Sequence, residues 1–281
     1  MWPLPRPAFS ARTSYDTCVG STQSKNRREK LQKAADSAEQ AGRRFRKAAA
    51  KSTLHKLRPE AFQLQGITGG DAVTWAYENG MVSTMKGRRI YDRLMAAPAH
   101  DICPLCGQGM VKSLDHFLPK SEFAALCVDP LNLIPACVDC NKAKGDQAPE
   151  SPETVTLHPY LDNIDDHPWL TARVVQEAPT WLEYFITPPG HWDTLLTSRA
   201  SHHFEVFNLA ELYSAQAGRT LNSIRLQLTD LLEETGPQSV RAYLEGEART
   251  RRAARLNGWE TAAYQAWAED DWFCAGGWTG I

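Results

Sequence analysis

Apolar residues recur at helical spacing near both ends of the chain and lose that spacing in the middle. In residues 24–58 they are sparse and stand among good helix formers, with Ser24 placed to cap a helix and Pro59 placed to end it. We expect one long helix or a pair of helices in this segment. Shorter helices are predicted at 71–79 and 88–97, where apolar positions again follow a helical period.

The C-terminal third carries the clearest helical periodicity, as the spacing of Leu221, Leu228 and Leu231 illustrates. Two apolar runs ahead of it flank Pro179 and predict a short hairpin. The predicted strands are Val174–Val175 and Trp181–Ile186, and the predicted helices lie near 208–234, 238–256 and 259–271, with Pro237 and Gly258 between them.

Between residues 102 and 146 the helical period fades, and Cys, Asp, His and Asn gather instead. We therefore expect a mainly α-helical fold that contains a small α+β module. The expected regions are a basic helical N-terminal region at 1–100, the module at 101–165, and a short hairpin with a helical C-terminal region at 166–281. The length of 281 residues is ample for a buried core.

The net charge of -2 conceals a strong asymmetry along the chain. Residues 1–100 hold 18 Lys and Arg against 8 Asp and Glu, whereas the remaining residues hold 13 against 25. The segment 25–58 alone holds 12 basic and 3 acidic side chains. Two interpretations stay open, namely a face that contacts a polyanion such as nucleic acid and an ordinary solvated helix surface.

No run of eighteen apolar residues occurs, so we expect no spanning helix and no membrane partner. The first 24 residues lack the continuous apolar stretch of a secretory signal. We therefore expect a cytoplasmic protein whose thiols stay reduced. Its seven cysteines then need an explanation other than a disulfide framework.

Four of the cysteines form two C-x-x-C pairs, Cys103/Cys106 and Cys137/Cys140, with thirty residues between them. Each pair lets one tight turn offer two thiolates, and two such turns complete the tetrahedral coordination of a structural zinc ion. Two unrelated coincidences or a redox pair are the alternatives. Ordinary buried thiols are expected at the other three positions, which are Cys18, Cys127 and Cys274.

The residues between and after the two pairs carry a further pattern. Leu114-Asp115-His116-Phe117-Leu118-Pro119-Lys120 is followed by Asn132 in an apolar run, and Asn141-Lys142-Ala143-Lys144 comes directly after Cys140. This arrangement resembles the HNH (ββα-metal) endonuclease motif in its four-cysteine form, and the resemblance covers about 45 residues. It implies a zinc-stapled nuclease module made of a hairpin and a helix.

The resemblance implies roles for individual residues. The catalytic set is His116, Asp115, Asn132 and Asn141. His116 is suited to act as general base, since an imidazole accepts a proton near neutral pH. Asp115 and Asn141 would bind a divalent ion, Mg²⁺ or Mn²⁺, through oxygen, and Asn132 would tie the long loop together by side-chain to backbone bonds.

Several polar side chains near this motif permit two interpretations. Lys120, Lys142 and Lys144 would contact substrate phosphates, or would be common surface lysines. Asp139 and Asp146 would be extra metal ligands, although solvent-facing carboxylates are the more usual case.

Two downstream segments, 158–162 and 166–170, resemble segments of HNH proteins in Septu-type anti-phage systems, where the nuclease subunit works with an ATPase. The closing segment 258–274 is also similar to the tails of such proteins. An ATPase partner and a role in antiviral defence are implied. The aromatic C-terminus would suit docking or, more simply, a helical core. His158, His167 and the pair at 202 and 203 are left out of the site.

The function predicted from these residues is metal-dependent endonuclease activity on DNA, with RNA as a second substrate class. One alternative is a non-catalytic zinc-finger module that binds nucleic acid, and another is a partner-docking subunit with a vestigial motif. A zinc finger alone does not need Asp115, His116 and Asn141 together, so their joint presence favours the nuclease.

Overall fold

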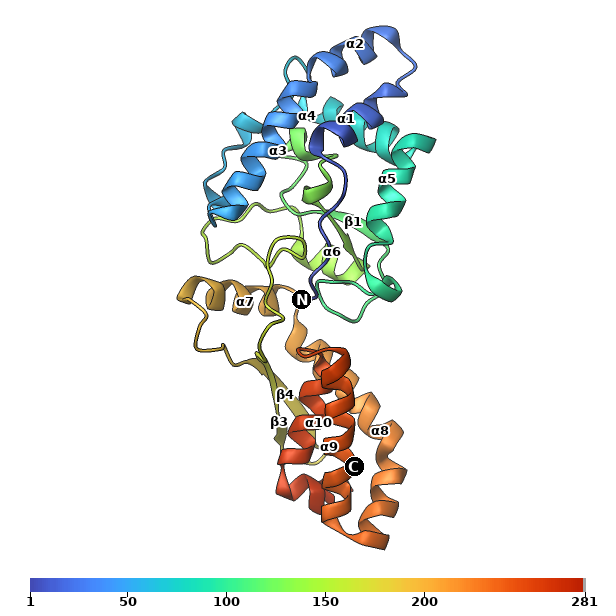
Figure 1. Ribbon diagram of the computed structural model, residues 1–281, viewed down its shortest axis with the longest axis vertical. Helices are drawn as coiled ribbons and strands as arrows, with labels where there is room; N and C mark the ends of the chain where they lie inside the picture. The colour runs from blue at the N-terminus through green and yellow to red at the C-terminus, as the bar shows by residue number, and fades with distance from the viewer. Residues whose placement is uncertain (280–281) are drawn as a thin grey trace. The chain divides into compact units, whose positions relative to one another are not determined.

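The computed structural model describes residues 1–279 and divides the chain into two compact units, Met1–Asn163 and Ile164–Ile281 (Figure 1). Both units are mainly helical, and in the described residues each contains one two-stranded antiparallel sheet. The predicted mainly α class is confirmed. Within residues 1–279 no helix combines the length and the apolar character needed to cross a membrane.

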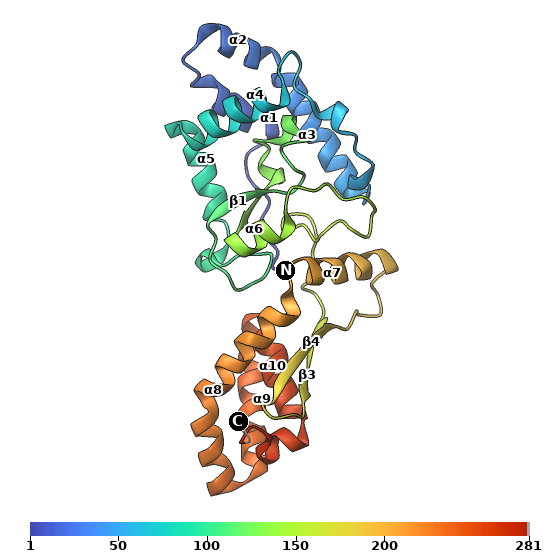
Figure 2. The same cartoon turned by 180° about the vertical axis from the view of Figure 1, so that it is seen from behind.

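The first unit begins with helices that surround the central module. They are α1 (Ala11–Gly20), α2 (Lys25–Lys33), α3 (Ala35–Ala50), α4 (Gly69–Ala72), the π-helical η3 (Val73–Val82) and α5 (Met85–Met95). Short 3-10 turns connect them and the module, namely η1 (Leu54–Lys56), η2 (Pro59–Phe62), η4 (Ala99–Asp101), η5 (Ala124–Leu126) and η6 (Pro130–Asn132). Figure 2 shows α5 alongside β1 from behind.

The basic segment after Ser24 forms a helix pair, α2 and α3, and Ser24 caps it as predicted by accepting a hydrogen bond from the Arg27 amide. The predicted end at Pro59 is wrong, because α3 stops at Ala50. The backbone turns there, since Ser52 adopts a left-handed φ of 52° and the Thr53 amide bonds back to the Ala48 carbonyl at 2.9 Å.

Helix α1 was not predicted, yet it anchors the unit. Ser10 caps it by accepting from the Thr13 amide at 3.0 Å. Its buried Ser14 donates to the carbonyl of Val128 at 2.6 Å, so the helix is bonded directly to the loop of the central module.

The module itself consists of β1 (Ser113–His116), β2 (Leu133–Ala136) and α6 (Val138–Lys144). The two strands pair antiparallel, with Asp115 opposite Ile134. The helices and the module share one core, in which Phe45 of α3 meets Phe117 edge-on at 6.4 Å between ring centroids. Residues 1–100 and 101–163 therefore form one compact unit.

The second unit contains the predicted hairpin and three predicted helices, all of which are confirmed. They are β3 (Leu170–Val175), β4 (Trp181–Ile186), α8 (Leu209–Thr235), α9 (Pro237–Ala254) and α10 (Trp259–Glu269). The additional helix α7 (Thr194–Val206) and the π-helical η7 (Phe273–Gly277) were not predicted. The hairpin lies against α8 and α10 (Figure 1).

The aromatic C-terminus mainly builds the core of this second unit. Tyr264, Trp267 and Trp278 are buried, and Trp267 stacks on Phe273 with 5.7 Å between ring centroids. Trp272 remains partly exposed. This arrangement agrees with the helical-core interpretation of these residues.

Candidate active site and zinc centre

The four predicted zinc ligands gather in one buried cluster. The Sγ atoms of Cys103, Cys106, Cys137 and Cys140 all lie within 4.8 Å of one another. The separation between Cys106 and Cys137 is 3.9 Å, close to the edge of about 3.8 Å expected when thiolates stand about 2.3 Å from a tetrahedral zinc. The cluster could hold a zinc ion with no position left for water.

Backbone turns hold the thiols in place. The Gly109 amide donates to Cys106 Sγ at 3.3 Å, and the Cys140 amide donates to Cys137 Sγ at 3.4 Å, where Cys137 also caps α6. Gly109 is needed because a Cβ there would lie 2.7 Å from the Cys137 sulfur. The remaining cysteines, Cys18, Cys127 and Cys274, are buried thiols as expected.

The ring of His116 is held on two sides. Its Nε2 lies 2.9 Å from the carbonyl oxygen of Cys127, and because a carbonyl only accepts, Nε2 carries the hydrogen and donates it. Tyr77 packs edge-on against the ring with 4.7 Å between centroids. Burial lowers the pKa of His116 to about 4, so the ring is neutral at pH 7 and Nδ1 is its proton acceptor.

Asp115 lies beside His116 on β1 and is buried. Lys144 donates to its Oδ1 at 3.4 Å and to the His116 carbonyl at 2.7 Å. The ammonium also lies 3.3 Å from Oδ2, yet it is not aligned to bond there, and Oδ2 has no hydrogen-bond partner among the described residues. Burial raises the pKa of Asp115 to about 6, and Lys144 opposes this rise.

Asn141 faces β1 from α6, and its amide nitrogen donates to the Ser113 hydroxyl at 2.8 Å. This bond fixes the amide and leaves Oδ1 as the atom that could bind a cation. Asp146 is exposed and lines the same cavity, so it offers another carboxylate, whereas Asp139 is exposed and does not line it.

The cavity over these residues has a volume of about 300 Å³. Five predicted site residues line it, namely Asp115, His116, Lys120, Asn141 and Lys142. Lys120 also places its ammonium 5.1 Å from the centre of the Tyr77 ring. Lys144 is largely buried against Asp115, so it orders the strand, and its contact with a phosphate stays a prediction.

Asn132 does not line this cavity. It is fully buried, its Oδ1 accepts from the Leu118 amide at 2.8 Å, and its Nδ2 donates to the carbonyls of Leu118 and Leu126. The side chain thus ties the loop between the strands together, as the sequence analysis expected.

Two contributors to the cavity region were missed by the sequence analysis. Tyr77 comes from η3, far from the motif, and no local signal marks it. Ser113 could have been found, because it lies two positions before Asp115 and therefore shares its face of β1. Its hydroxyl reaches Asn141 for that reason.

The donor set fits a hard divalent cation. It comprises Asp115 Oδ2, which accepts no hydrogen bond from the described residues although the Lys144 ammonium lies 3.3 Å away, the amide oxygen of Asn141 and the nearby carboxylate of Asp146. Oxygen ligands of this kind suit Mg²⁺ or Mn²⁺.

Comparison with known proteins agrees with this geometry. The HNH endonuclease family model matches residues 103–147. This stretch is therefore similar to HNH endonuclease domains. The chain is also similar to Protein ea31 of Escherichia phage lambda, with 28% identity over 236 residues and coverage of 79% of each chain. No solved structure matches the chain.

Proposed function

We propose that the protein is a metal-dependent endonuclease that hydrolyses phosphodiester bonds in DNA, with RNA as a second substrate class. The supporting observation is that the proton acceptor His116 and the oxygen donors Asp115 and Asn141 line one cavity inside the HNH domain. The alternative of a zinc finger without catalysis gives no reason for a neutral, oriented histidine beside an orphaned carboxylate oxygen.

Each residue that lines the cavity would take a different role in the hydrolysis. His116 takes a proton from the attacking water through Nδ1, and the Cys127 carbonyl stabilises the resulting imidazolium through the Nε2 hydrogen. Asp115 and Asn141 would hold the divalent ion, which when bound supplies positive charge to the phosphate and to the leaving oxygen. Lys120 and Lys142 add positive charge at the cavity wall.

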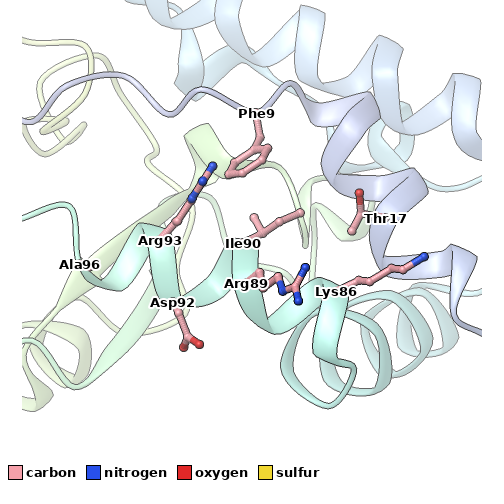
Figure 3. A pocket seen from close by; sticks show the side chains of 8 residues that line it. All are labelled: Phe9, Thr17, Lys86, Arg89, Ile90, Asp92, Arg93 and Ala96. Carbon is pink, nitrogen blue, oxygen red and sulfur yellow. The ribbon is translucent and has the colours of Figure 1, made fainter.

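A second pocket of the same unit supports a polyanionic substrate. It lies between the N-terminal segment, α1 and α5, has a volume of about 670 Å³, and is lined by three cations, Lys86, Arg89 and Arg93 (Figure 3). The guanidinium of Arg93 lies 5.5 Å from the ring centre of Phe9. The only acid in its lining, Asp92, is paired with Arg88. Phosphate groups are suited to such a surface.

The proposal extends to an ATPase partner and a role in anti-phage defence. Its support is the resemblance of residues 158–162 and 166–170 to the Septu-type nuclease subunit. The first of these segments closes the module, since the buried His158 bonds to the Leu131 carbonyl at 3.0 Å and packs on Phe117. Copurification of a tagged chain from cells that carry its neighbouring genes would test the partner.

The activity is tested by incubating supercoiled plasmid and single-stranded RNA with wild type and His116→Ala. Each incubation includes Mg²⁺, Mn²⁺ or EDTA. We expect metal-dependent nicking or linearisation by wild type alone. Zinc content and circular dichroism serve as controls, since His116→Ala should keep both. Plasmid binding without cleavage by wild type, with or without the copurified partner, would favour the non-catalytic alternative.

A further inference from the structure

The second unit contains another cluster of metal-ligating side chains, formed by Asp166, His167 and His191. We propose that it is a second transition-metal site, suited to Zn²⁺ and separate from both the cysteine cluster and the HNH cavity. His167 Nδ1 lies 3.4 Å from Asp166 Oδ2, and His191 Nε2 lies 3.6 Å from the same oxygen. The three ligand atoms all lie within 4.8 Å of one another.

These separations match one face of a coordination tetrahedron. Ligand atoms that stand about 2.0 to 2.1 Å from zinc at tetrahedral angles are about 3.3 to 3.4 Å apart. The imidazole rings of His167 and His191 are already side by side, with 4.3 Å between their centroids. Small side-chain rotations at these half-exposed residues would bring both nitrogens and the carboxylate onto one ion, which leaves a fourth position open.

The backbone under Asp166 and His167 is fixed in advance. Asn257 is buried, its Nδ2 donates to the carbonyl of His167 at 2.9 Å and to Asp165 Oδ1 at 3.0 Å, and its Oδ1 accepts from the Trp169 amide at 2.8 Å. The hydrogen bonds of this one side chain thus fix the turn that carries Asp166 and His167, two of the three ligands. A preorganised turn reduces the entropy lost when the ion binds.

The loop of His191 is ordered from the other side. Trp192 donates its amide to the Pro189 carbonyl at 3.0 Å, and Asp193 caps α7 by accepting from the Leu196 amide at 2.7 Å. The rings of Trp169 and Trp192 contact each other at 6.2 Å between centroids and join the two segments. The third ligand is therefore presented from a loop that already packs on the first two.

The donor chemistry selects the ion. Two imidazoles and one carboxylate suit borderline metals such as Zn²⁺, Co²⁺ or Ni²⁺, whereas Mg²⁺ prefers oxygen. The ligands stand where the hairpin opens, because β3 begins at Leu170 and pairs there with Ile186 at the end of β4. A bound ion would tie the segment before β3 to the loop after β4 and stabilise the second unit.

The test measures zinc stoichiometry on the full chain. Wild type, His167→Ala, His191→Ala and the control His202→Ala, a histidine of α7 outside the cluster, are dialysed against buffered free Zn²⁺ and analysed by mass spectrometry. Asp115→Asn is included to separate this site from the HNH cavity. We expect each cluster variant to lose one equivalent of zinc relative to wild type. His202→Ala and Asp115→Asn should both retain that equivalent.

A second readout uses Co²⁺ added, with excess Mg²⁺, to protein that carries a single equivalent of Zn²⁺, which the four-cysteine cluster takes and which leaves the proposed site open. We expect a d–d absorption band without thiolate charge transfer in wild type and its loss in His167→Ala and His191→Ala. The ligands are exposed, so circular dichroism of the variants should match wild type. Equal zinc content in wild type and both cluster variants, or an unchanged cobalt band, would overturn the proposal.

Discussion

The Nε2 hydrogen of His116 is donated to the carbonyl oxygen of Cys127 across 2.9 Å. This bond determines the tautomer, because the donor nitrogen cannot also accept a proton, and Nδ1 is left as the proton acceptor of the ring. The first prediction follows from it. His116→Ala should lower the cleavage rate by about 10²- to 10⁴-fold, the usual contribution of a general base. Single-turnover cleavage at saturating protein measures the rate, and unchanged cleavage would contradict the assignment.

The close approach of Gly109 to the cysteine cluster gives a second prediction. Gly109→Ala would place a methyl group 2.7 Å from both the Cβ and the Sγ of Cys137, so the thiols must move apart. We expect at least a tenfold loss of zinc affinity in competition with a chelator, together with a lower melting temperature of the first unit. Gly20→Ala is the matched control, since its Cβ meets nothing within 4 Å.

Ser113 is predicted to act on the reaction only through Asn141. Removal of its hydroxyl in Ser113→Ala frees the amide that now donates across 2.8 Å. We expect a 10- to 100-fold loss of activity or metal affinity, as is usual when the partner of a ligand is removed. The Mn²⁺ concentration that gives half-maximal cleavage should rise by a larger factor than the KM for plasmid. An unaltered Mn²⁺ dependence would show that Asn141 needs no such support.

The basic pocket should contribute to affinity without reading sequence. The double variant Arg89→Gln/Arg93→Gln should weaken binding to all duplexes alike. The slope of log K against log salt concentration should become shallower by the contribution of about two phosphate contacts. Fluorescence anisotropy across a salt series measures both quantities. Arg219→Gln/Arg249→Gln removes two exposed arginines from the second unit and serves as control. Equal salt slopes for the two double variants would argue against a nucleic-acid contact at this pocket.

Replacing the buried Asp129 by asparagine should raise the stability of the protein, and the gain should depend on pH. Asp129 is buried, its Oδ1 accepts from the Leu131 amide at 3.1 Å, and burial raises its pKa to about 6. The unfolded chain releases this proton near pH 4, so the folded state loses stability as pH rises from about 4 to about 6. Asp129→Asn should remove that loss and stabilise the protein by roughly 1 to 3 kcal/mol above pH 6.

Urea unfolding at pH 4.5 and pH 7 measures this effect. The difference between Asp129→Asn and wild type should be larger at pH 7 than at pH 4.5. Glu150→Gln, which removes an exposed carboxylate, should give the same small difference at both values. A wild type that is the more stable protein at pH 7 would contradict the argument.

The parts of the site that could be predicted from sequence are those fixed by local spacing. The two C-x-x-C pairs had to form tight turns, and Asp115 with His116 had to stand on opposite faces of one strand. Tyr77 could not be predicted, because its contact with His116 depends on how η3 packs against the module. The cluster of His167 and His191 likewise depends on the hairpin bringing two distant loops together.

The same distinction applies to the helices. The C-terminal helices have apolar positions at regular spacing, so their limits were predicted closely. Helix α3 ends before Pro59, because Ser52 adopts a left-handed backbone conformation. Glycine or asparagine usually marks such a position in a sequence, and neither is present here. Helix α1 could have been recognised, because Ala11, Tyr15, Cys18 and Val19 follow a helical period and are all buried.

The shared core of the first unit limits whether residues 103–147, the stretch that matches the HNH family, could fold and work in another protein. Phe117 packs against Phe45 of α3 and against His158, and the ring of His116 packs edge-on against Tyr77. A fragment cut at residues 103 and 147 would lose all three of these supports and would expose apolar rings to water. Grafting the motif alone into another scaffold would therefore transfer the four cysteines and the bond from His116 to the Cys127 carbonyl, but not the ring contacts that pack around them. The surrounding helices would have to be moved together with the motif.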